Sequence, residues 1–566
     1  MAKQEANTRT RRFACDFETT TRNEEQCVWS FGAYDFTSGE YYKGISIEDF
    51  FDFIEGEDGE EKILYFHNLK FDGSYILNWL LRNGYTQVES EARQKIKPYE
   101  FTANVDEMGS WYSINVNIGD VQVTILDSLK LLPMSIAAIA DGFELEIKKG
   151  SIDYNKERPK GYIPTAEEAE YQYNDCWILG NALKKFEEIV GSKPKTTIAS
   201  TALKDFKSII GYKKFNEMYK NKLTDKIDND IRTGYCGGLC YLNPDFKEQL
   251  LTVSSIDVNS MYPSIMYDYY LPYGTPTLIY PTSLELDEDK LYIVKINGRF
   301  ILKDGKLPCI QHKTSRYGKN KYVVDSEVNI DIIRPLEEVK LILKHYEVKD
   351  LRIKYAYAFE KENENFKLYI QKWYDGKTKA KLEHNSSLKI ICKLFLNSCY
   401  GKFGAAQTTT KKQFYLNEGI LRGVDAYTDE DCMLYLPVAM FITSYARVKL
   451  VKTAQKIHEQ GKFIYCDTDS VHFIDGANLD GIEISNTKLG AWDLEESGVV
   501  GKYLRQKTYL HKDGDKYECK CCGMPNECKK HVNFDNFNIG ETFNGKLMYR
   551  QCKGGAKLVE TTFTIK

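Results

Sequence analysis

The order of apolar and polar positions predicts a chain that mixes strands with helices. Across residues 13–18 (FACDFE) apolar side chains take every second position, so Asp16 and Glu18 share the opposite face of a strand. Apolar runs and helical spacing predict strands at 121–126 and 251–258, a strand entering a helix at 62–79, helices at 166–188 and 366–403, and a hairpin at 463–473. This alternation indicates an α/β unit that ends near residue 195, where GSKPKT (191–196) is typical of a linker.

Charge along the chain is local rather than general. A length of 566 residues allows about three to five packed units, and 42% hydrophobic residues exclude a disordered chain. With 77 Lys and Arg against 81 Asp and Glu the net charge is −4, so bulk charge does not indicate a nucleic-acid binder. The helical segment 366–403, however, carries eight lysines against two acids, and we expect a basic surface there.

The cysteines and the apolar runs bear on where the protein works. Fifteen cysteines is an odd number, and scattered cysteines beside apolar residues are typical of reduced thiols in a cytosolic protein. The apolar run 434–442 is too short to span a bilayer, and the first twelve residues lack an apolar signal core. We therefore expect a protein that is neither secreted nor bound to a membrane.

Four acids in the N-terminal third have the character of a metal site. Asp16 and Glu18 share a strand face, and Asp72 follows the sequence NLKF. Asp175 lies one helical turn after Tyr171. Converging carboxylates need cations, and two Mg²⁺ or Mn²⁺ ions about 4 Å apart would activate water for phosphodiester hydrolysis. The alternative is that these acids are unrelated surface charges.

A second set of acids lies in the C-terminal half. Asp257 comes at the end of an apolar strand, and Asp467 and Asp469 lie at a tight turn of the predicted hairpin. These positions again predict an oxygen-only site for paired divalent ions. An isolated Asp-x-Asp pair is more often a solvated turn, but here a strand, a turn and a basic helix occur in one chain.

The basic helix supplies positive charge for such a site. One stripe of this helix carries Lys389, Lys393, Asn397 and Tyr400, and the face expected to pack inward carries Leu388, Ile391, Phe395 and Cys399. Positive charge above a dinuclear acidic site is what a triphosphate requires. A solvated lysine face is the alternative, but the stripe leads into NSCYGKF (397–403), whose glycine suggests close approach to a base pair.

Two other signals are weaker. The sequence GKT (376–378) lacks the upstream glycine of a Walker loop, because Gln371 stands at that position. A histidine and several cysteines lie close together near the C-terminus, at Cys519, Cys521, Cys522, Cys528 and His531, but their spacing is irregular for a zinc site. We therefore expect neither an ATPase nor bound zinc.

In combination these segments resemble the protein-primed family-B DNA polymerases of the phage phi-29 type. The resemblance runs from CDFETT (15–20) to TFTIK (562–566). The polymerase motifs match residues 257–263, 393–404, 443–447, 465–470 and 507–509 in order, and YCGG (235–238) matches the connector between exonuclease and polymerase. The fold class it implies is a multidomain α/β chain, in which an N-terminal RNase-H-like 3′–5′ exonuclease domain precedes a right-hand polymerase with palm, fingers, thumb and two protein-priming insertions.

The resemblance implies roles for individual exonuclease residues. The metal ligands and catalytic residues would be Asp16, Glu18, Asp72, Asp175, Tyr171 and Lys149. Single-stranded DNA would contact His67, Asn68, Phe71, Ser128 and Leu129.

Roles in the polymerase site are implied in the same way. Two Mg²⁺ or Mn²⁺ ions would be held by Asp257, Asp467, Asp469 and the carbonyl of Val258. The incoming dNTP would contact Lys381, Lys389, Lys393, Asn397, Tyr400 and Tyr262, the last of which would exclude a ribose 2′-hydroxyl. Primer-template DNA would contact Tyr235, Gly237, Gly238, Thr443, Arg447, Lys507 and Tyr509, the last two at the primer end.

The resemblance also divides the chain and names partners. It implies a flexible tail at 1–12, an exonuclease domain at 13–196, palm at 197–269 and 437–521, a terminal-protein insertion at 270–365, fingers at 366–404, a strand-displacement and processivity insertion at 405–436, and a thumb at 522–566. The implied partners are a terminal protein that primes synthesis, primer-template DNA and single-stranded DNA. The chain is expected to act as a monomer in the cytoplasm of a bacterial host, where it replicates a linear viral genome.

Three positions depart from the family pattern, and two rival hypotheses stay open. Ser151 stands where the family has Asp after Lys-Gly, so no metal role is assigned to it; Cys399 and Gly404 replace Leu and Ala. The rivals are an exonuclease with a degenerate polymerase half and a non-enzymatic single-stranded DNA-binding protein. The intact palm acids argue against the first, and the acid sets argue against the second, which would need only stacking and basic grooves.

Overall fold

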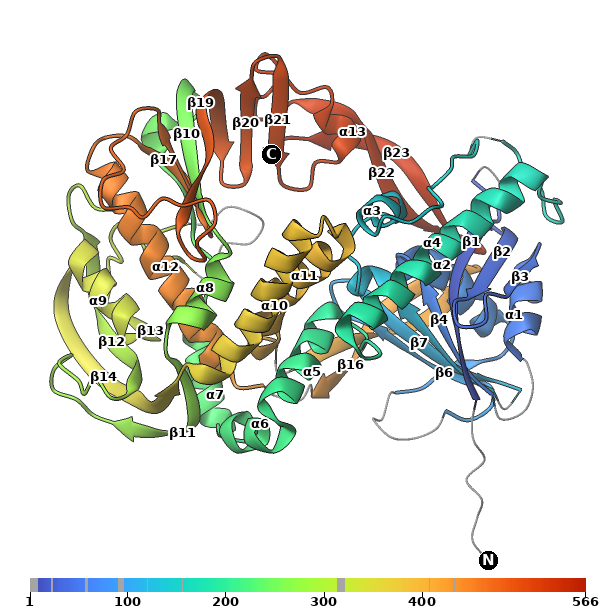
Figure 1. The fold of residues 1–566 in the computed structure, drawn as a ribbon, viewed down its shortest axis with the longest axis horizontal. Coiled ribbons are helices and arrows are strands. Elements are labelled where there is room, and N and C mark those ends of the chain that lie inside the picture. The colour runs from blue at the N-terminus through green and yellow to red at the C-terminus, as the bar shows by residue number, and fades with distance from the viewer. Residues whose placement is uncertain are drawn as a thin grey trace, which may run out of the picture.

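The computed structural model describes residues 9–21, 24–55, 60–89, 96–119, 121–154, 156–312, 321–406, 408–430 and 434–566. Within these ranges no helix combines the length and the apolar character that a membrane crossing needs. The N-terminal sheet lies on one side of the molecule and a second large sheet on the other, with helices between them (Figure 1).

An eight-stranded sheet, ordered β3-β2-β1-β4-β8-β7-β6-β5, forms the N-terminal unit. Its strands are β1 (Arg9–Thr19), β2 (Val28–Asp35), β3 (Tyr41–Gly44), β4 (Glu60–Phe66), β5 (Thr86–Gln87), β6 (Glu100–Val105), β7 (Trp111–Ile118) and β8 (Val121–Asp127). Its helices are α1 (Ile47–Glu55), α2 (Leu69–Arg82), η1 (Ser128–Lys130), α3 (Ile136–Gly142) and α4 (Ala166–Val190). The predicted alternation on β1 is confirmed, because Phe13, Cys15 and Phe17 are all buried.

Strand β1 begins four residues earlier than predicted. Residues 9–12 pair in parallel with β4, Arg11 lies 3.0 Å from Asp35 of β2, and Arg12 pairs with Glu187 of α4. The assignment of residues 9–12 to a flexible tail is therefore wrong, because the arginines find acidic partners in the folded unit. The rest of that predicted tail lies outside the described residues.

The second large sheet corresponds to the predicted palm and is ordered β21-β20-β19-β10-β18-β17-β9. Its strands are β9 (Cys240–Leu242), β10 (Leu250–Val258), β17 (Phe463–Asp467), β18 (Ser470–Ile474), β19 (Trp492–Arg505), β20 (Thr508–Asp513) and β21 (Lys516–Cys521). The helices α8 (Met261–Asp268) and α12 (Leu436–His458) pack on each other, and α12 also packs on β17 and β18. Helices α5 (Ile198–Ile210), α6 (Tyr212–Tyr219) and α7 (Asp225–Gly234) lead from the N-terminal unit into this sheet, with η2 (Pro244–Phe246) after β9.

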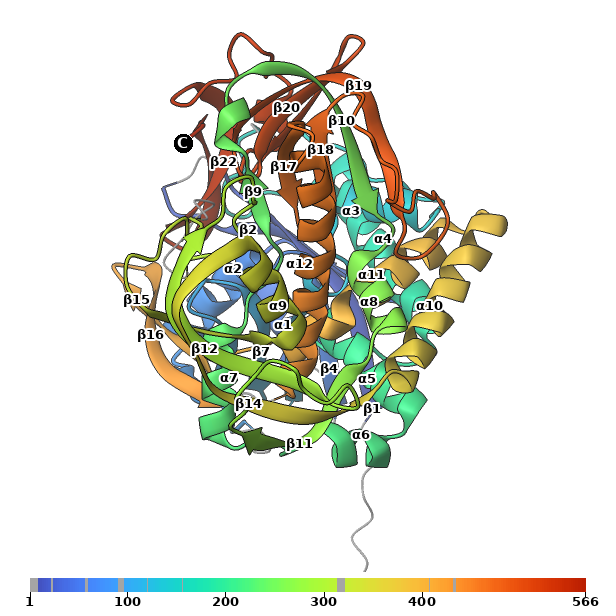
Figure 2. The same cartoon turned by 90° about the vertical axis from the view of Figure 1, so that its left-hand side faces the viewer.

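The predicted first insertion forms a sheet of its own, ordered β11-β14-β12-β13. Its elements are β11 (Leu271–Ile279), β12 (Leu291–Leu302), β13 (Ile330–Pro335), α9 (Leu336–His345) and β14 (Tyr346–Glu362). Figure 2 shows this curved sheet in front of α12, and the two are in contact through β11 and α9.

The basic segment, predicted as one helical stretch, is two helices. These are α10 (Glu364–Leu382) and α11 (Ser386–Phe403), separated at His384, whose φ is +53°. Asn385 caps α11 by accepting a hydrogen bond from the Leu388 N–H at 2.9 Å. Of the predicted inward face of α11, Ile391, Phe395 and Cys399 are fully buried, whereas Leu388 is half-buried.

Two hairpins connect the N-terminal unit with the C-terminal end. The hairpin β15 (Thr408–Asn417) and β16 (Ile420–Glu430) packs on β6, and at its tip Gly419 accepts a hydrogen bond from the Gly554 N–H at 3.3 Å. Gly554 joins β22 (Thr542–Cys552) to β23 (Gly555–Thr564), and β23 packs on α2. Figure 1 shows β22 and β23 reaching from the palm sheet toward the N-terminal unit.

The C-terminal core extends across the predicted palm and thumb boundary at residue 521. Leu504 and Leu510 of the palm strands share one apolar cluster with Phe543 and Ile565. The short helix α13 (Asn526–Lys529) lies against β22 and contributes Cys528 to the same cluster.

Candidate active sites

Strand β1 and helices α2 and α4 bring the four N-terminal acids together. Burial and the charge of Asp175 raise the pKa of Asp16 to about 7. Burial and the charge of Asp16 also raise the pKa values of Glu18 and Asp72 well above their ordinary range. The acids are therefore close enough to repel one another, and divalent cations relieve such repulsion.

Lys149 supplies positive charge to this N-terminal acid site. Its Nζ pairs with Oδ2 of Asp175 and lies 5.0 Å from the centre of the Tyr171 ring. The other carboxylate oxygen of Asp175, Oδ1, is buried and has no hydrogen-bond partner within the described parts of the chain. An orphaned buried oxygen beside three more carboxylates fits a site for hard divalent ions.

Tyr154 belongs to the same site, although no sequence pattern indicated it. Its hydroxyl lies 2.7 Å from the hydroxyl of Tyr171. Burial and this hydrogen bond raise the pKa of Tyr154, so both phenols stay protonated at neutral pH. Tyr154 lies outside regular secondary structure, where no periodic pattern could have indicated it.

The palm sheet holds the second set of acids through its strand register. Ser470 of β18 pairs with Asp257 of β10 on one side and with Asp467 of β17 on the other. Asp469 lies in the turn between β17 and β18, and its carbonyl accepts a hydrogen bond from the Val258 N–H at 2.8 Å. Three carboxylates are thus fixed at the ends of neighbouring strands.

The palm acids repel one another as the N-terminal acids do. Burial and the charge of Asp469 raise the pKa of Asp257 to about 8, and burial and the charge of Asp467 raise the pKa of Asp469 to about 6. Lys507 Nζ donates to both carboxylate oxygens of Asp467, at 2.9 and 2.7 Å. An all-oxygen set of this kind fits paired divalent ions.

Helices α10 and α11 present a cluster of lysines to the palm acids. The pKa of Lys377 is lowered by burial and by the positive charges of Lys393, Lys389 and Lys381. These four side chains therefore lie near one another, and Lys393 also acts on Asp257, where it opposes the effect of burial on the pKa. No role was predicted for Lys377 from the sequence.

Two aromatic rings lie beside this lysine cluster. Tyr262 of α8 and Tyr400 of α11 have ring centroids 4.4 Å apart at an angle of 38°. Asn397 is exposed on the same side of α11 as Lys393. Of the predicted nucleotide ligands, Lys393, Tyr262 and Tyr400 thus lie near the palm acids, since the charge of Lys393 acts on Asp257 and that of Asp469 on both tyrosines.

Comparisons with known proteins place this arrangement in a family. The family described as "DNA polymerase type B, organellar and viral" matches residues 58–166 and 153–477. The DNA polymerases of Bacillus phage phi29 and Streptococcus phage Cp-1 are 36% and 35% identical to this chain, each over 98% of it and over 99% and 98% of their own lengths. The chain belongs to the type B DNA polymerases.

A solved structure supports the same assignment for the fold. Phi29 DNA polymerase complexed with primer-template DNA and incoming nucleotide matches this type B polymerase with a TM-score of 0.89. The identity is 36%, and the match covers 98% of this chain and 100% of that chain. The predicted fold class, an exonuclease unit followed by palm, fingers and thumb, is confirmed.

The connector of this type B polymerase touches the palm turn. The Thr468 N–H donates to the carbonyl of Leu239 at 2.8 Å, and a Cβ added to Gly238 would lie 2.4 Å from the Thr468 side chain. Gly238 therefore allows the connector to approach the turn between Asp467 and Asp469. Gly237 is exposed beside it.

Gly404 lies close to a tyrosine of the connector. A Cβ added to Gly404 would lie 2.5 Å from the hydroxyl of Tyr235. Glycine at this position therefore gives room to the connector tyrosine. Cys399 is fully buried in the core of the fingers, and Ser151 is exposed after Lys149.

Thr443 and Arg447 are placed differently from the prediction. Both are buried in α12, and Arg447 donates to the two carboxylate oxygens of Glu338 at 3.0 and 2.5 Å. Arg447 Nη1 also donates to the carbonyls of Cys236 and Gly237 at 2.6 and 2.7 Å. Direct DNA contact by these two side chains does not fit this structure, because both are buried and the donors of Arg447 are taken by Glu338 and the connector.

The predicted single-strand ligands lie at one end of β4 and β8. His67 contacts Ser128 Oγ through Nδ1 at 3.0 Å and the Met134 carbonyl through Nε2 at 2.7 Å. Ser128 is fully buried, so its hydroxyl orients His67 rather than facing solvent. Asp127, for which the sequence predicted no role, accepts hydrogen bonds from the backbone of Asn68 and Leu129 at 3.0 Å each. Phe71 is half-buried on α2.

A series of buried hydrogen bonds lies beside Tyr509, the predicted primer ligand. The Tyr503 hydroxyl lies 3.0 Å from His472 and 2.8 Å from His511, and His511 lies 2.7 Å from Glu496. The ring of Tyr509 packs against His511 at 4.8 Å between centroids. Burial lowers the pKa of His472 to about 3, so this ring is neutral.

Three residues of this hydrogen-bonded group also have side chains of the kinds that bind metal ions. Within the described ranges, His472, Glu496 and His511 are the only group of three or more His, Cys, Asp or Glu side chains with ligand atoms within 4.8 Å of one another. These side chains already bond within the chain, because His472 and His511 contact the Tyr503 hydroxyl and Glu496 contacts His511. Of the C-terminal cysteines, Cys528 donates to the Asn544 carbonyl at 3.2 Å.

Proposed function

We propose that this type B polymerase extends a DNA primer on a DNA template in the palm and removes nucleotides from a 3′ end in the N-terminal unit. The observation that carries the proposal is the pair of separate carboxylate sites, in which Asp16 and Asp257 have strongly raised pKa values. The solved complexes of phi29 DNA polymerase with primer-template DNA, incoming nucleotide and single-stranded DNA support the same classes of ligand here.

Two Mg²⁺ or Mn²⁺ ions are proposed for each site. The palm ligands would be Asp257, Asp467, Asp469 and the Val258 carbonyl, and the exonuclease ligands would be Asp16, Glu18, Asp72 and Asp175. When bound, such ions stabilise the charge on the attacking and leaving oxygens of a phosphoryl transfer. The orphaned Oδ1 of Asp175 supports a ligand role for that residue.

The fingers and palm residues would hold the reactants of nucleotide transfer. The primer 3′ oxygen forms the new bond to the α-phosphorus while the bond to pyrophosphate breaks, so negative charge grows on pyrophosphate. Lys381, Lys389 and Lys393 would stabilise that negative charge, and Lys377 would contribute further positive charge beside them. Tyr262 would lie beneath the sugar and leave no room for a 2′-hydroxyl.

The exonuclease residues would orient a water molecule against the last phosphodiester bond. Lys149 and Tyr171 lie at Asp175, so both can donate hydrogen bonds to the phosphate or the water. Tyr154 would fix the rotation of the Tyr171 hydroxyl, which makes Tyr154 a positioning residue. His67, Asn68 and Phe71 would guide the single strand toward these groups.

The two hairpins support processive strand displacement. β15 and β16 pack on the exonuclease sheet, and their tip contacts the hairpin β22 and β23. A chain closed in this way would retain the template and separate the duplex ahead. Deletion of residues 408–430 should leave short gap filling intact but abolish synthesis through duplex DNA, and survival of displacement would contradict this role.

The relatives from Bacillus and Streptococcus phages support further parts of the proposal. A terminal protein would prime synthesis by docking on the insertion sheet formed by β11, β12, β13 and β14. The polymerase would act as a monomer in the cytoplasm of a bacterial host.

Rolling extension on a primed single-stranded circle tests the proposal directly. With Mg²⁺, dNTPs and no helper proteins, the product should exceed the length of the circle. Products that stop at a filled circle would contradict strand displacement. Degradation without extension would favour the exonuclease-only rival, and binding that persists in chelator without turnover would favour a single-strand binder.

A further inference from the structure

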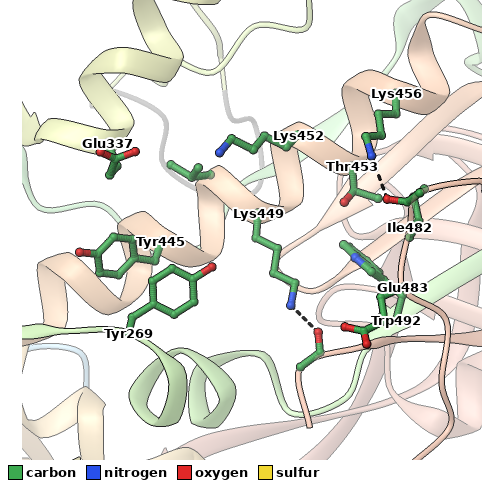
Figure 3. A pocket seen from close by; sticks show the side chains of 13 residues that line it. Tyr269, Glu337, Tyr445, Lys449, Lys452, Thr453, Lys456, Ile482, Glu483 and Trp492 are labelled. Carbon is green, nitrogen blue, oxygen red and sulfur yellow. Dashed lines mark hydrogen bonds between the residues drawn. The ribbon is translucent and has the colours of Figure 1, made fainter. Parts of the chain in front are cut away.

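A pocket with a cavity volume of 530 Å³ lies beside helix α12, and none of the acids of the two sites lines it. It is lined by α12, the start of α9, Tyr269 after α8, and the segment 481–492. Figure 3 shows Tyr269 and Tyr445 side by side at one end and Lys456 with Glu483 at the other. No residue assigned above to catalysis or DNA contact lines it. A pocket of this size holds one small ligand.

Three lysines give this pocket an excess of positive charge. Lys449, Lys452 and Lys456 follow one side of α12 at spacings of three and four residues. Lys449 donates to the carbonyl of Gly490, and Lys456 donates to the carbonyl of Gly481 at 2.9 Å. Across the parts of the chain that the structure describes, none of the three lysines forms an ion pair with a carboxylate.

The acids of the pocket do not balance these lysines. Glu337 pairs with Lys340 at 3.4 Å, and Glu483 pairs with Lys488 at 2.5 Å. Burial lowers the pKa of Lys449, while the charges of Asp268 and Glu483 oppose this effect and that of Lys488 adds to it. A half-buried ammonium group whose contact is a neutral carbonyl gains from an anion beside it.

Aromatic rings line the same cavity. Tyr269 and Tyr445 have ring centroids 4.6 Å apart, and Tyr269 is 38% exposed. Trp492 lines the pocket from the first residue of β19. An exposed ring beside cations is the combination that recognises a base together with its phosphate.

We infer that this pocket binds one phosphate-bearing nucleotide, with its base against Tyr269 and its phosphate at Lys449, Lys452 and Lys456. The nucleotide is either free or one unit of a single strand, and both offer the same chemistry. The pocket segment that contains Gly490 is joined to the end of the strand that carries Asp257. Asn259, which follows that strand, exchanges backbone hydrogen bonds with Gly490 and Ala491 at 2.9 Å each. The pocket is separate from the nucleotide site of the fingers.

Calorimetric titration of the full chain in chelator tests this site without divalent ions in the catalytic centres. The probes are dAMP, a short oligo-dT and inorganic phosphate. The variant Lys452→Gln with Lys456→Gln removes two exposed charges, and Lys213→Gln with Lys214→Gln on α6 is the charge-matched control. We expect the pocket variant to weaken nucleotide binding by at least about 10-fold, the effect of losing charge-assisted contacts, and the control to match the wild type.

The probes separate the two sources of nucleotide. Weaker binding of dAMP identifies a free nucleotide, and weaker binding of oligo-dT alone identifies a single strand. Equal affinity of wild type and pocket variant for both nucleotide probes would overturn the inference. Wild-type affinity of Tyr269→Ala for both nucleotide probes would also overturn the inference, because Tyr269 would then not contact the base. Primer extension by the pocket variant should equal that of the wild type, which shows that the chain is folded.

Discussion

The exonuclease and polymerase acids of this chain are held by different kinds of structure. In the N-terminal unit, Asp16, Asp72 and Asp175 come from a strand and two helices that are distant in sequence. In the palm, Asp257 and Asp467 lie on strands paired through Ser470 of β18. The exonuclease site therefore depends on how helices pack on a sheet, whereas the polymerase site depends on backbone register.

The lysines at the two acid sites differ in how exposed their side chains are. The side chain of Lys149 is 29% exposed and pairs with Asp175, which is 8% exposed. The side chain of Lys507 is 49% exposed and pairs with Asp467, which is 22% exposed. Lys149 is thus more enclosed in its site than Lys507, which is the lysine predicted to contact the primer end. The two acid sites therefore differ in how exposed their lysines are.

The largest expected effect is the loss of one activity without the other. Asp469→Ala should reduce primer extension by more than about 100-fold, because removal of one stabilising group in a catalytic site costs that much. Degradation of a single-stranded 3′ end should persist. Extension and degradation are measured on the same labelled primer, with and without dNTPs.

The reciprocal variant is the control for that result. Asp16→Ala with Asp72→Ala should remove degradation and retain extension. If either variant loses both activities while its circular dichroism spectrum is unchanged, the two sites are not independent.

The sequence indicated some of these residues and not others, for physical reasons. Period-2 alternation placed Asp16 and Glu18 correctly, because the pattern depends only on local strand geometry. Tyr154 and Lys377 act through contacts between elements, which periodicity within one element cannot show. The resemblance implied DNA contact for Arg447, and nothing near it in the sequence indicated its partner Glu338, which lies 109 residues away.

The boundaries show the same limit. Charged residues at 9–12 indicated a tail, but their partners on β2 and α4 convert them into a strand. The break at His384 has a positive φ that a non-glycine residue rarely adopts, so composition gave no sign of it. The thumb shares its core with the palm strands, and no linker composition marks the change.

A second, smaller effect separates nucleotide binding from DNA binding. Lys393→Ala should weaken apparent dNTP affinity by about 10- to 150-fold, the equivalent of one charge-assisted phosphate contact, and leave exonuclease activity unchanged. Lys379→Ala, on the exposed side of α10 beside Glu383, is the matched control. Single-turnover insertion across dNTP concentrations measures the first effect, and gel shift across a salt series measures duplex affinity. A defect confined to the gel shift would reassign Lys393 to DNA.

Sugar discrimination should belong to the polymerase site alone. Tyr262→Val should raise ribonucleotide insertion on the order of 10- to 100-fold, because loss of the ring opens space beneath the sugar. Tyr262→Phe keeps the ring and should keep the discrimination. Steady-state insertion ratios for ATP and dATP measure this effect, and an unchanged ratio in Tyr262→Val would show that the ring only packs against Tyr400.

The smallest expected effect is on stability, and it follows from the raised pKa values at both sites. In the folded chain the pKa of Asp16 is about 7 and that of Asp257 about 8, against an ordinary value of 3.8. Between pH 4 and these values the folded chain holds more protons than the unfolded chain, so in chelator its stability should fall as pH rises.

Mg²⁺ competes with those protons and binds the folded chain, so it should raise the apparent Tm more at pH 8 than at pH 6. Each kcal/mol of added stability corresponds to about 2–4 °C for units of this size, which differential scanning fluorimetry resolves. Asp16→Asn and Asp257→Asn should each raise the apparent Tm in chelator and reduce the Mg²⁺ increment. An increment that is equal at both pH values would show that the acids do not bind the ion in competition with protons.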